Sequence, residues 1–199
     1  MATVEPRVAA AIAHARHLLE DGLPGWLAYH DLAHTTELVA PAAEDLGRAA
    51  GLDDRQLGLL AVAAWFHDVG FVERYADNEP IGAELAATTM AGLGFSPHDV
   101  EEVADAILAT ALPQSPTTEL GRLLCDADLS VLGTERFAER DAGLRTELAH
   151  EGQDLDDDAW SRRQLAFLES HDWWTEAARA RWAATKAAHV VAVRAQLEA

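Results

Sequence analysis

Cysteine is nearly absent from this sequence, which has Cys125 alone among its 199 residues. One cysteine cannot form an internal disulfide, and it cannot build the multi-cysteine motifs that bind zinc. No apolar run reaches the roughly 20 residues that a membrane-spanning helix needs. Near the amino terminus, His14, Arg16 and His17 interrupt the segment in which a signal peptide would carry its apolar core. We therefore expect a cytoplasmic protein with no membrane partner.

Basic residues are also scarce. The chain has 15 Lys and Arg residues against 34 Asp and Glu, which gives a formal net charge of -19 at pH 7. A surface of this sign repels the phosphates of nucleic-acid polymers, so the charge balance disfavours a nucleic-acid-binding module. Hydrophobic residues make up 49% of the chain, which is an ordinary share for a folded protein, and the length fits one domain.

A helical pattern runs along almost the whole chain. Apolar residues recur at helical spacing, and clusters of β-branched residues bounded by turn signals are missing. We predict an all-α fold, a single compact multi-helix bundle over residues 1–199 with its core at about 25–135 and packing helices at about 135–199. The expected helices cover about 5–20, 31–50, 54–68, 79–92, 96–111, 118–132, 135–150, 158–170 and 175–197.

Local signals mark several helix ends. Asp53 and Gln56 form a capping-box pattern, and Ser96 is an N-cap serine followed directly by a proline. Gly70 is expected to end the helix at 54–68. Pro41 is expected to kink or break the helix at 31–50.

Two histidine clusters stand out as candidates for chemistry. His30 and His34 lie four residues apart, so a helix places both on one face. His67 and Asp68 form an adjacent pair directly after an apolar run. An ionised carboxylate in apolar surroundings needs a cation or hydrogen-bond donors. Taken alone, each cluster also fits a structural role, such as a hydrogen-bonded core histidine or an aspartate that caps a helix.

A third cluster consists of Asp126 and Asp128, which interrupt another apolar helical stretch. Together the three clusters supply imidazoles and carboxylates from three helices, and this mixed set of nitrogen and oxygen ligands suits a divalent metal with open water positions. Residues two apart on a helix point roughly 200° apart. Asp126 and Asp128 are therefore not expected to bind one ion together.

In this order, the clusters resemble the HD superfamily of metal-dependent phosphohydrolases, whose pattern is a His, a His-Asp doublet and a distal Asp. The likeness extends to Tyr-His-x-x-x-His-Thr at 29–35, Ala-x-Trp-Phe-His-Asp-Val-Gly at 63–70 and Asp-Ala-Asp-Leu-Ser at 126–130. It covers about residues 25–135 and is closest to small stand-alone HD proteins. The resemblance implies an HD-type helical bundle that hydrolyses phosphoesters with the help of a metal.

The resemblance also implies a ligand set for one divalent metal, which is His34, His67, Asp68 and Asp128. Asp126 would then orient a histidine, and the reverse assignment of Asp126 and Asp128 stays open. Between the doublet and the distal pair the only further histidine is His98, which argues against a second metal. Two histidines and two carboxylates suit Mn²⁺, Fe²⁺, Co²⁺ or Ni²⁺ better than Mg²⁺ or Zn²⁺.

The implied reaction is attack of a metal-activated water on phosphorus. Asp68 would bind the metal and accept a proton, and His30 or Glu79 would assist the leaving group. His30 equally fits a buried structural histidine, and Glu79 equally fits an acid that stabilises a helix N-terminus. The negative surface favours a small phosphorylated substrate, with nucleoside monophosphates and other phosphomonoesters before cyclic dinucleotides.

The same residues also suggest other functions, some of which the sequence disfavours. A metal-containing sensor that binds a nucleotide without turnover would share the same residues. A redox HD protein that uses iron and O₂ would need further histidines that this chain lacks. The segment 30–34 (His-Asp-Leu-Ala-His) mimics a zinc-protease motif, but its aspartate is one methylene shorter than the glutamate base. Apolar faces on the Ala-rich helices also allow a homodimer.

Overall fold

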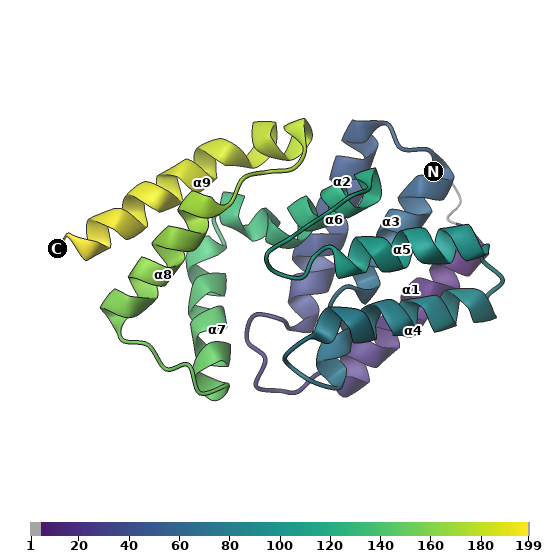
Figure 1. The fold of residues 1–199 in the computed structure, drawn as a ribbon, viewed down its shortest axis with the longest axis horizontal. Coiled ribbons are helices and arrows are strands. Elements are labelled where there is room, and N and C mark those ends of the chain that lie inside the picture. Colours follow the sequence, from purple (N-terminus) through teal and green to yellow (C-terminus); the bar gives the residue numbers. More distant parts are fainter. Residues whose placement is uncertain (1–4, 199) are drawn as a thin grey trace.

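A computed structural model describes residues 5–198, most of which lie in helices, with no strand among them (Figure 1). The all-α prediction is confirmed. The domain expected over 1–199 includes residues 1–4 and 199, which lie outside the described residues. The α-helices are α1 (Pro6–Gly22), α2 (Ala40–Ala50), α3 (Asp54–Phe66), α4 (Asn78–Gly92), α5 (Pro97–Leu108), α6 (Glu119–Asp128), α7 (Phe137–His150), α8 (Asp157–Ser170) and α9 (Glu176–Leu197).

Three shorter helical segments alter the expected boundaries. The helix predicted at 31–50 contains a π-helical segment, η1 (His34–Val39), that continues into α2, and Pro41 lies in the first turn of α2. The helices predicted to end at 68 and 132 end earlier, and each is followed by a 3-10 turn, η2 (Val69–Val72) or η3 (Leu129–Gly133). Gly70 therefore lies inside η2 and does not end α3. The capping boxes at Asp53 and Ser96 are both present.

Gly70 is needed for a close approach of two backbones. A Cβ atom on Gly70 would lie 1.9 Å from the carbonyl oxygen of Asn78. Only a residue without a side chain lets η2 pack against the first turn of α4 at this distance. The sequence signal at Gly70 therefore reflects packing between two segments and not a helix stop.

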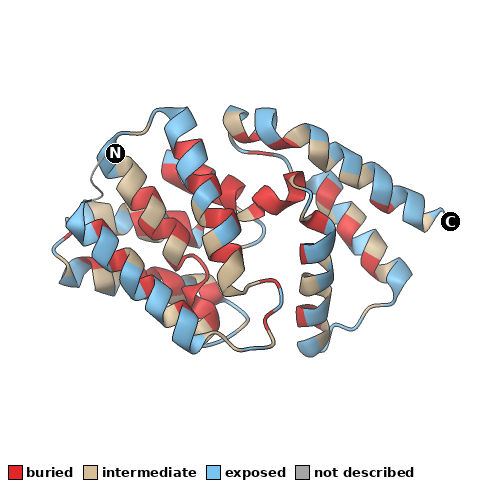
Figure 2. Cartoon of the chain, turned by 180° about the vertical axis from the view of Figure 1, so that it is seen from behind, coloured by how far each residue is buried: buried red, intermediate tan, exposed pale blue. Residues whose placement is uncertain are grey.

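The core of the bundle surrounds α3. Its residues Leu59, Leu60, Ala63 and Phe66 are at most 1% exposed, and α3 contacts α1, α2, α4, α5 and α6. A helix that is apolar on all sides is stable only when it is covered on all sides. Figure 2 shows this burial, since the inner helices are mostly red and the outer faces are pale blue.

The last three helices form a separate layer beside the bundle (Figure 1). α9 packs against η3 and α8. Trp182 of α9 lies so close to Gly133 that a Cβ atom on that glycine would be 2.2 Å from the Trp182 Cβ. The layer is thereby anchored to η3, directly after the distal pair of aspartates. Within residues 5–198, no helix is long and apolar enough to cross a bilayer.

Candidate metal centre

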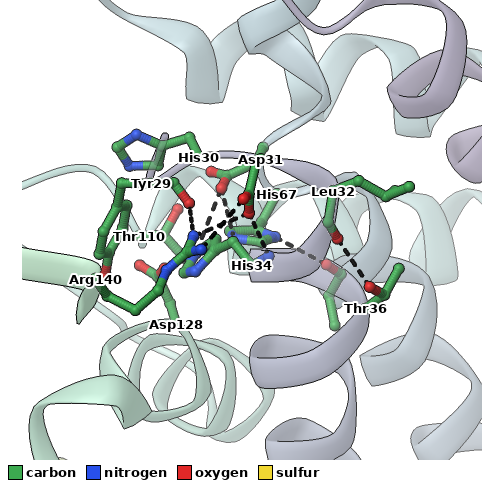
Figure 3. Close-up of polar contacts among 12 residues, drawn as sticks. Tyr29, His30, Asp31, Leu32, His34, Thr36, His67, Thr110, Asp128 and Arg140 are labelled. Atoms are coloured by element: carbon green, nitrogen blue, oxygen red, sulfur yellow. Dashed lines mark hydrogen bonds and ion pairs between the residues drawn. The ribbon is translucent and has the colours of Figure 1, made fainter. Parts of the chain in front are cut away.

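Four side chains from three distant segments of the sequence meet at one point of the bundle. His34 Nε2 lies 3.2 Å from Asp128 Oδ1 and 3.5 Å from Asp68 Oδ2. His67 Nε2 lies 3.2 Å from Asp68 Oδ2 and 3.6 Å from Asp128 Oδ1. Figure 3 shows His34, His67 and Asp128 from their three elements pointing toward one another. We call these four residues the His/Asp cluster.

Each member of the cluster stands at a helix end. His34 is the first residue of η1, His67 follows the last residue of α3, and Asp128 is the last residue of α6. Asp68 has φ -105° and ψ 3°, a bridge conformation between the helical and extended regions. The turn between α3 and η2 therefore directs the side chains of both His67 and Asp68 to the same place, which a continuous α-helix would not do.

Two potential metal-binding atoms of the cluster, His67 Nε2 and Asp68 Oδ2, have no hydrogen-bond partner among the described residues. His67 Nδ1 lies 2.8 Å from the carbonyl oxygen of Ala64 and so carries the ring proton, which leaves a lone pair on Nε2. Among residues 5–198, neither His67 Nε2 nor Asp68 Oδ2 makes a hydrogen bond, and both atoms are buried. Two ligands at about 2.1 Å from one ion stand at most about 4.2 Å apart. The four nitrogen-to-oxygen separations given above fall within this limit, and His34, His67 and Asp68 each offer a ligand atom within 4.8 Å of the others, so the residues fit a divalent metal.

Electrostatics within the cluster compensates the burial of its charges. Burial raises the pKa of Asp128, but its contacts with His34 and His67 outweigh this effect and leave the pKa below its ordinary value. Burial likewise opposes the charge of Asp68, yet the neighbouring His67 holds its pKa below the usual range. The two carboxylates raise the pKa of His67 well above normal, although burial lowers it. The cluster therefore attracts positive charge, which a proton or a metal can supply.

Asp126 takes no part in the cluster, so the expectation that it binds the metal or orients a histidine is wrong. Its Oδ1 accepts the backbone N–H of Trp174 at 2.8 Å, and its Oδ2 accepts the backbone N–H of Thr175 at 2.8 Å and the Thr175 hydroxyl at 2.7 Å. Thr175 is the N-cap of α9. Asp126 is fully buried, and its hydrogen bonds fix the start of α9. The Asp128 side chain points instead toward the histidines.

His30 lies beside the cluster but outside the ligand set. Its ring stacks on Phe71 with 4.3 Å between centroids, and its centroid is 5.9 Å from that of His34. The alternative of a histidine bound to the backbone does not hold, because its Nδ1 lies 2.8 Å from Glu147 Oε2. Burial lowers the pKa of His30, but the hydrogen bond to Glu147 outweighs it and raises this pKa above its usual value.

Glu147 of α7 is a site residue that sequence reasoning missed. Its Oε1 accepts the backbone N–H groups of Tyr29 and His30, the latter at 2.7 Å, and the Tyr75 hydroxyl donates to its Oε2 at 3.3 Å. The side chain is fully buried. Burial raises the pKa of Glu147, but its contacts with His30 lower it further than burial raises it. Glu147 is one of 34 acidic residues in the chain, and no pattern in the sequence around it indicates such a role.

Arg140, also on α7, holds the same segment from the other side. Its guanidinium donates to both oxygens of Asp31, at 3.0 and 3.2 Å, and to the carbonyl oxygen of Tyr29. Asp31 in turn accepts the backbone N–H of His34 at 2.9 Å. The contacts of Arg140 with Tyr29 and Asp31 are visible in Figure 3. The expectation that residues after Gly133 only pack around the core is therefore incomplete. Side chains of α7 position the segment 29–34, which carries His30 and His34.

A cavity of about 810 Å³ opens beside the cluster, and its lining includes Asp68, Asp128 and His30. Glu79, in the first turn of α4, also lines it and makes no side-chain hydrogen bond within residues 5–198. Such a volume suits a small-molecule ligand. The two expected carboxylate ligands, Asp68 and Asp128, and both candidate proton donors, His30 and Glu79, thus border one space, whereas Asp126 does not.

Comparisons with protein-family models, with curated proteins and with solved structures find no match to this chain. The chemistry of the site must therefore be inferred from the residues themselves. They offer two imidazole nitrogens and two carboxylate oxygens at a buried point, and a histidine held by a buried carboxylate beside it.

Proposed function

We propose that this protein is an HD-type metal-dependent phosphohydrolase that cleaves a small phosphoester, such as a nucleotide or another phosphomonoester. The convergence of His34, His67, Asp68 and Asp128 beside the cavity carries the proposal. Purely structural buried ion pairs normally satisfy their own polar atoms. Here the buried atoms His67 Nε2 and Asp68 Oδ2 lack hydrogen bonds within the described chain, which favours a metal as their partner.

The His/Asp cluster would hold one divalent ion. When bound, the ion lowers the pKa of a coordinated water toward neutrality and polarises a phosphoryl oxygen. Mn²⁺, Fe²⁺, Co²⁺ and Ni²⁺ accept two nitrogen and two oxygen ligands and still leave room for water. Mg²⁺ prefers oxygen ligands alone, and four protein ligands would fill the tetrahedral shell of Zn²⁺.

The remaining steps use this chain's own groups. As the water oxygen bonds to phosphorus, Asp68 accepts a proton from it, and the bond from phosphorus to the ester oxygen breaks. His30 donates a proton to the departing alcohol oxygen, since Glu147 keeps the pKa of the imidazole above its usual value and fixes its Nδ1. Glu79, which also lines the cavity, is the alternative proton donor. The products are the alcohol and inorganic phosphate.

The test starts from protein treated with a chelator and reloaded with single metals. Hydrolysis of 4-nitrophenyl phosphate should return with Mn²⁺, Fe²⁺, Co²⁺ or Ni²⁺ and disappear again with chelator. Bound metal should also stabilise the fold, by about 2.7 kcal/mol at 100 times its dissociation constant. Activity that survives complete metal removal would contradict the proposal. Binding of metal and nucleotide without any turnover would instead favour a sensor or binding module.

A further inference from the structure

The cavity beside the cluster has an apolar part that the chemistry at phosphorus does not use. Six of its lining residues come from η3, α7 and α8 and are large and apolar. We call them the apolar chamber, which consists of Leu129, Leu132, Phe137, Leu144, Leu148 and Phe167. These residues belong to the carboxy-terminal layer and the turn that anchors it. The cavity is thus lined both by carboxylates of the His/Asp cluster and by an apolar wall from η3, α7 and α8.

The charges of the lining are strongly one-sided. Apart from Asp68 and Asp128, the lining includes Asp77, Glu79 and Asp141. Arg163 is its one arginine or lysine among the described residues, and its guanidinium is already hydrogen-bonded to Gln153 Oε1 at 3.0 Å. A second phosphate of a ligand would therefore meet more carboxylates than cations. The lining favours a ligand with a single phosphoryl group, placed at the His/Asp cluster.

Besides Asp141, Arg163 and Ser170, the part of the lining from α7 and α8 has one polar side chain, the buried Gln164. Gln164 of α8 lines the cavity and is 4% exposed, and its amide makes no hydrogen bond within residues 5–198. A buried amide is satisfied by a water or by one polar atom of a ligand. A heavily hydroxylated group, such as a sugar, would lose several hydrogen bonds to water and regain few of them.

We propose that the apolar chamber binds the organic group of the substrate, and that the substrate is a phosphomonoester of a largely apolar, uncharged alcohol. The proposal rests on the proposed function for the position of the phosphoryl group. It narrows the substrate class from small phosphoesters in general to those that carry one phosphoryl group and a hydrophobic body. Esters of polar sugars and esters with two or more phosphates are correspondingly poor substrates.

Calorimetric binding of phosphonates to the Mn²⁺-loaded protein tests this without requiring turnover. In the series from methylphosphonate to hexylphosphonate, each CH₂ group that leaves water should tighten binding about fourfold. Hexane-1,6-diphosphonate, which places a second charge in the chamber, should bind at least tenfold more weakly than hexylphosphonate. Equal affinity along the series, or tighter binding of the diphosphonate, would overturn the proposal.

A matched pair of variants locates the effect. Leu144→Ser puts a hydroxyl into a half-buried position of the chamber, so it should reduce the gain in binding affinity per CH₂ group. Val191→Ser makes the same kind of change on α9 at a side chain that is 65% exposed and outside the lining, so the gain should stay. If both variants keep the full gain, the organic group binds elsewhere and the chamber assignment fails. If a variant does not fold, the dependence of affinity on alkyl chain length in the unmodified protein still tests the proposal.

The two proposals fail in different ways. If the phosphonates bind with the expected gain but no alkyl phosphate is hydrolysed, the hydrolase proposal fails and the chamber stands. If methyl, hexyl and sugar phosphates are all hydrolysed with equal kcat/KM and the phosphonates bind equally, the hydrolase proposal stands and the chamber assignment is wrong.

Discussion

Asp126 and Asp128 lie two residues apart at the end of α6, and their carboxylates serve different parts of the molecule. Asp128 Oδ1 is 3.2 Å from His34 Nε2 in the His/Asp cluster. Asp126 Oδ2 accepts the backbone N–H of Thr175 at 2.8 Å and so holds the start of α9. The helix turns by roughly 200° between the two positions. One short motif therefore links the candidate metal centre to the carboxy-terminal layer.

The same isosteric change at these two aspartates should have opposite consequences. Asp128→Asn removes a charged ligand and should weaken Mn²⁺ binding more than about 100-fold. Asp126→Asn should leave metal binding within a few fold and instead lower the free energy of unfolding by about 1–3 kcal/mol, because three donors lose a charged acceptor. Metal content after dialysis and urea unfolding of each variant measure the two effects. Loss of metal from Asp126→Asn with the fold intact would show that the ligand assignment is reversed.

Glu147→Gln should lower kcat by roughly 10-fold or more and leave metal content unchanged. The glutamine oxygen can still accept the backbone N–H groups of Tyr29 and His30, but the negative charge that raises the pKa of His30 is lost. Steady-state kinetics on 4-nitrophenyl phosphate, with metal analysis of the same samples, measures the effect.

Glu139→Gln is the matched control for this substitution. Glu139 lies on the same helix, its side chain is 68% exposed, and its nearest cation is Arg136 at 3.6 Å. Its kcat should stay within about twofold of the unmodified protein, because exposed ion pairs contribute little. A similar decrease in kcat for both variants would mean that the overall charge of α7 matters and that the contact with His30 does not.

His171 should make the protein less stable in mild acid. Burial, with Lys186 nearby, lowers the pKa of His171 to about 4, and neither ring nitrogen has a hydrogen-bond partner within residues 5–198. Because the folded-state pKa lies below the unfolded value of 6.5, the unfolded chain binds the proton first as the pH falls. Stability is therefore full above about pH 6.5 and decreases by about 3 kcal/mol by pH 4.

His171→Phe removes the titrating group and keeps a ring beside Trp173. Urea unfolding at several pH values between 7 and 4 should show a smaller decrease in stability for this variant than for the unmodified protein, since the acidic residues titrate in both. Parallel pH profiles would mean that His171 is protonated in the folded state as readily as in the unfolded chain.

Gly70→Ala should destabilise the fold by about 3 kcal/mol or more, because its Cβ would collide with the Asn78 backbone at 1.9 Å. Gly92→Ala is the control at the last residue of α4, where an added Cβ meets nothing within 4 Å. It should leave stability unchanged or raise it by up to about 1 kcal/mol. Thermal unfolding of both variants measures the difference, and equal unfolding temperatures would contradict the close packing of η2 on α4.

Much of the fold could be predicted from local sequence patterns. Asp53 and Ser96 cap the starts of α3 and α5 as expected, because the partners of a cap lie three residues away in the chain. The ends of α3 at Phe66 and of α6 at Asp128 could not be predicted, since apolar periodicity continues into η2 and η3. Whether such a stretch stays α-helical or tightens into a 3-10 turn depends on what packs against it.

The sequence by itself determined the helical class and named residues that could bind a metal, because periodicity, caps and side-chain chemistry are properties of neighbours along the chain. The tertiary structure decided that Asp128 and not Asp126 faces the histidines, and that Arg140 and Glu147 hold the segment at 29–34. Glu147 and His30 are 117 residues apart. A contact over that separation depends on how complete helices pack, and no local pattern encodes it.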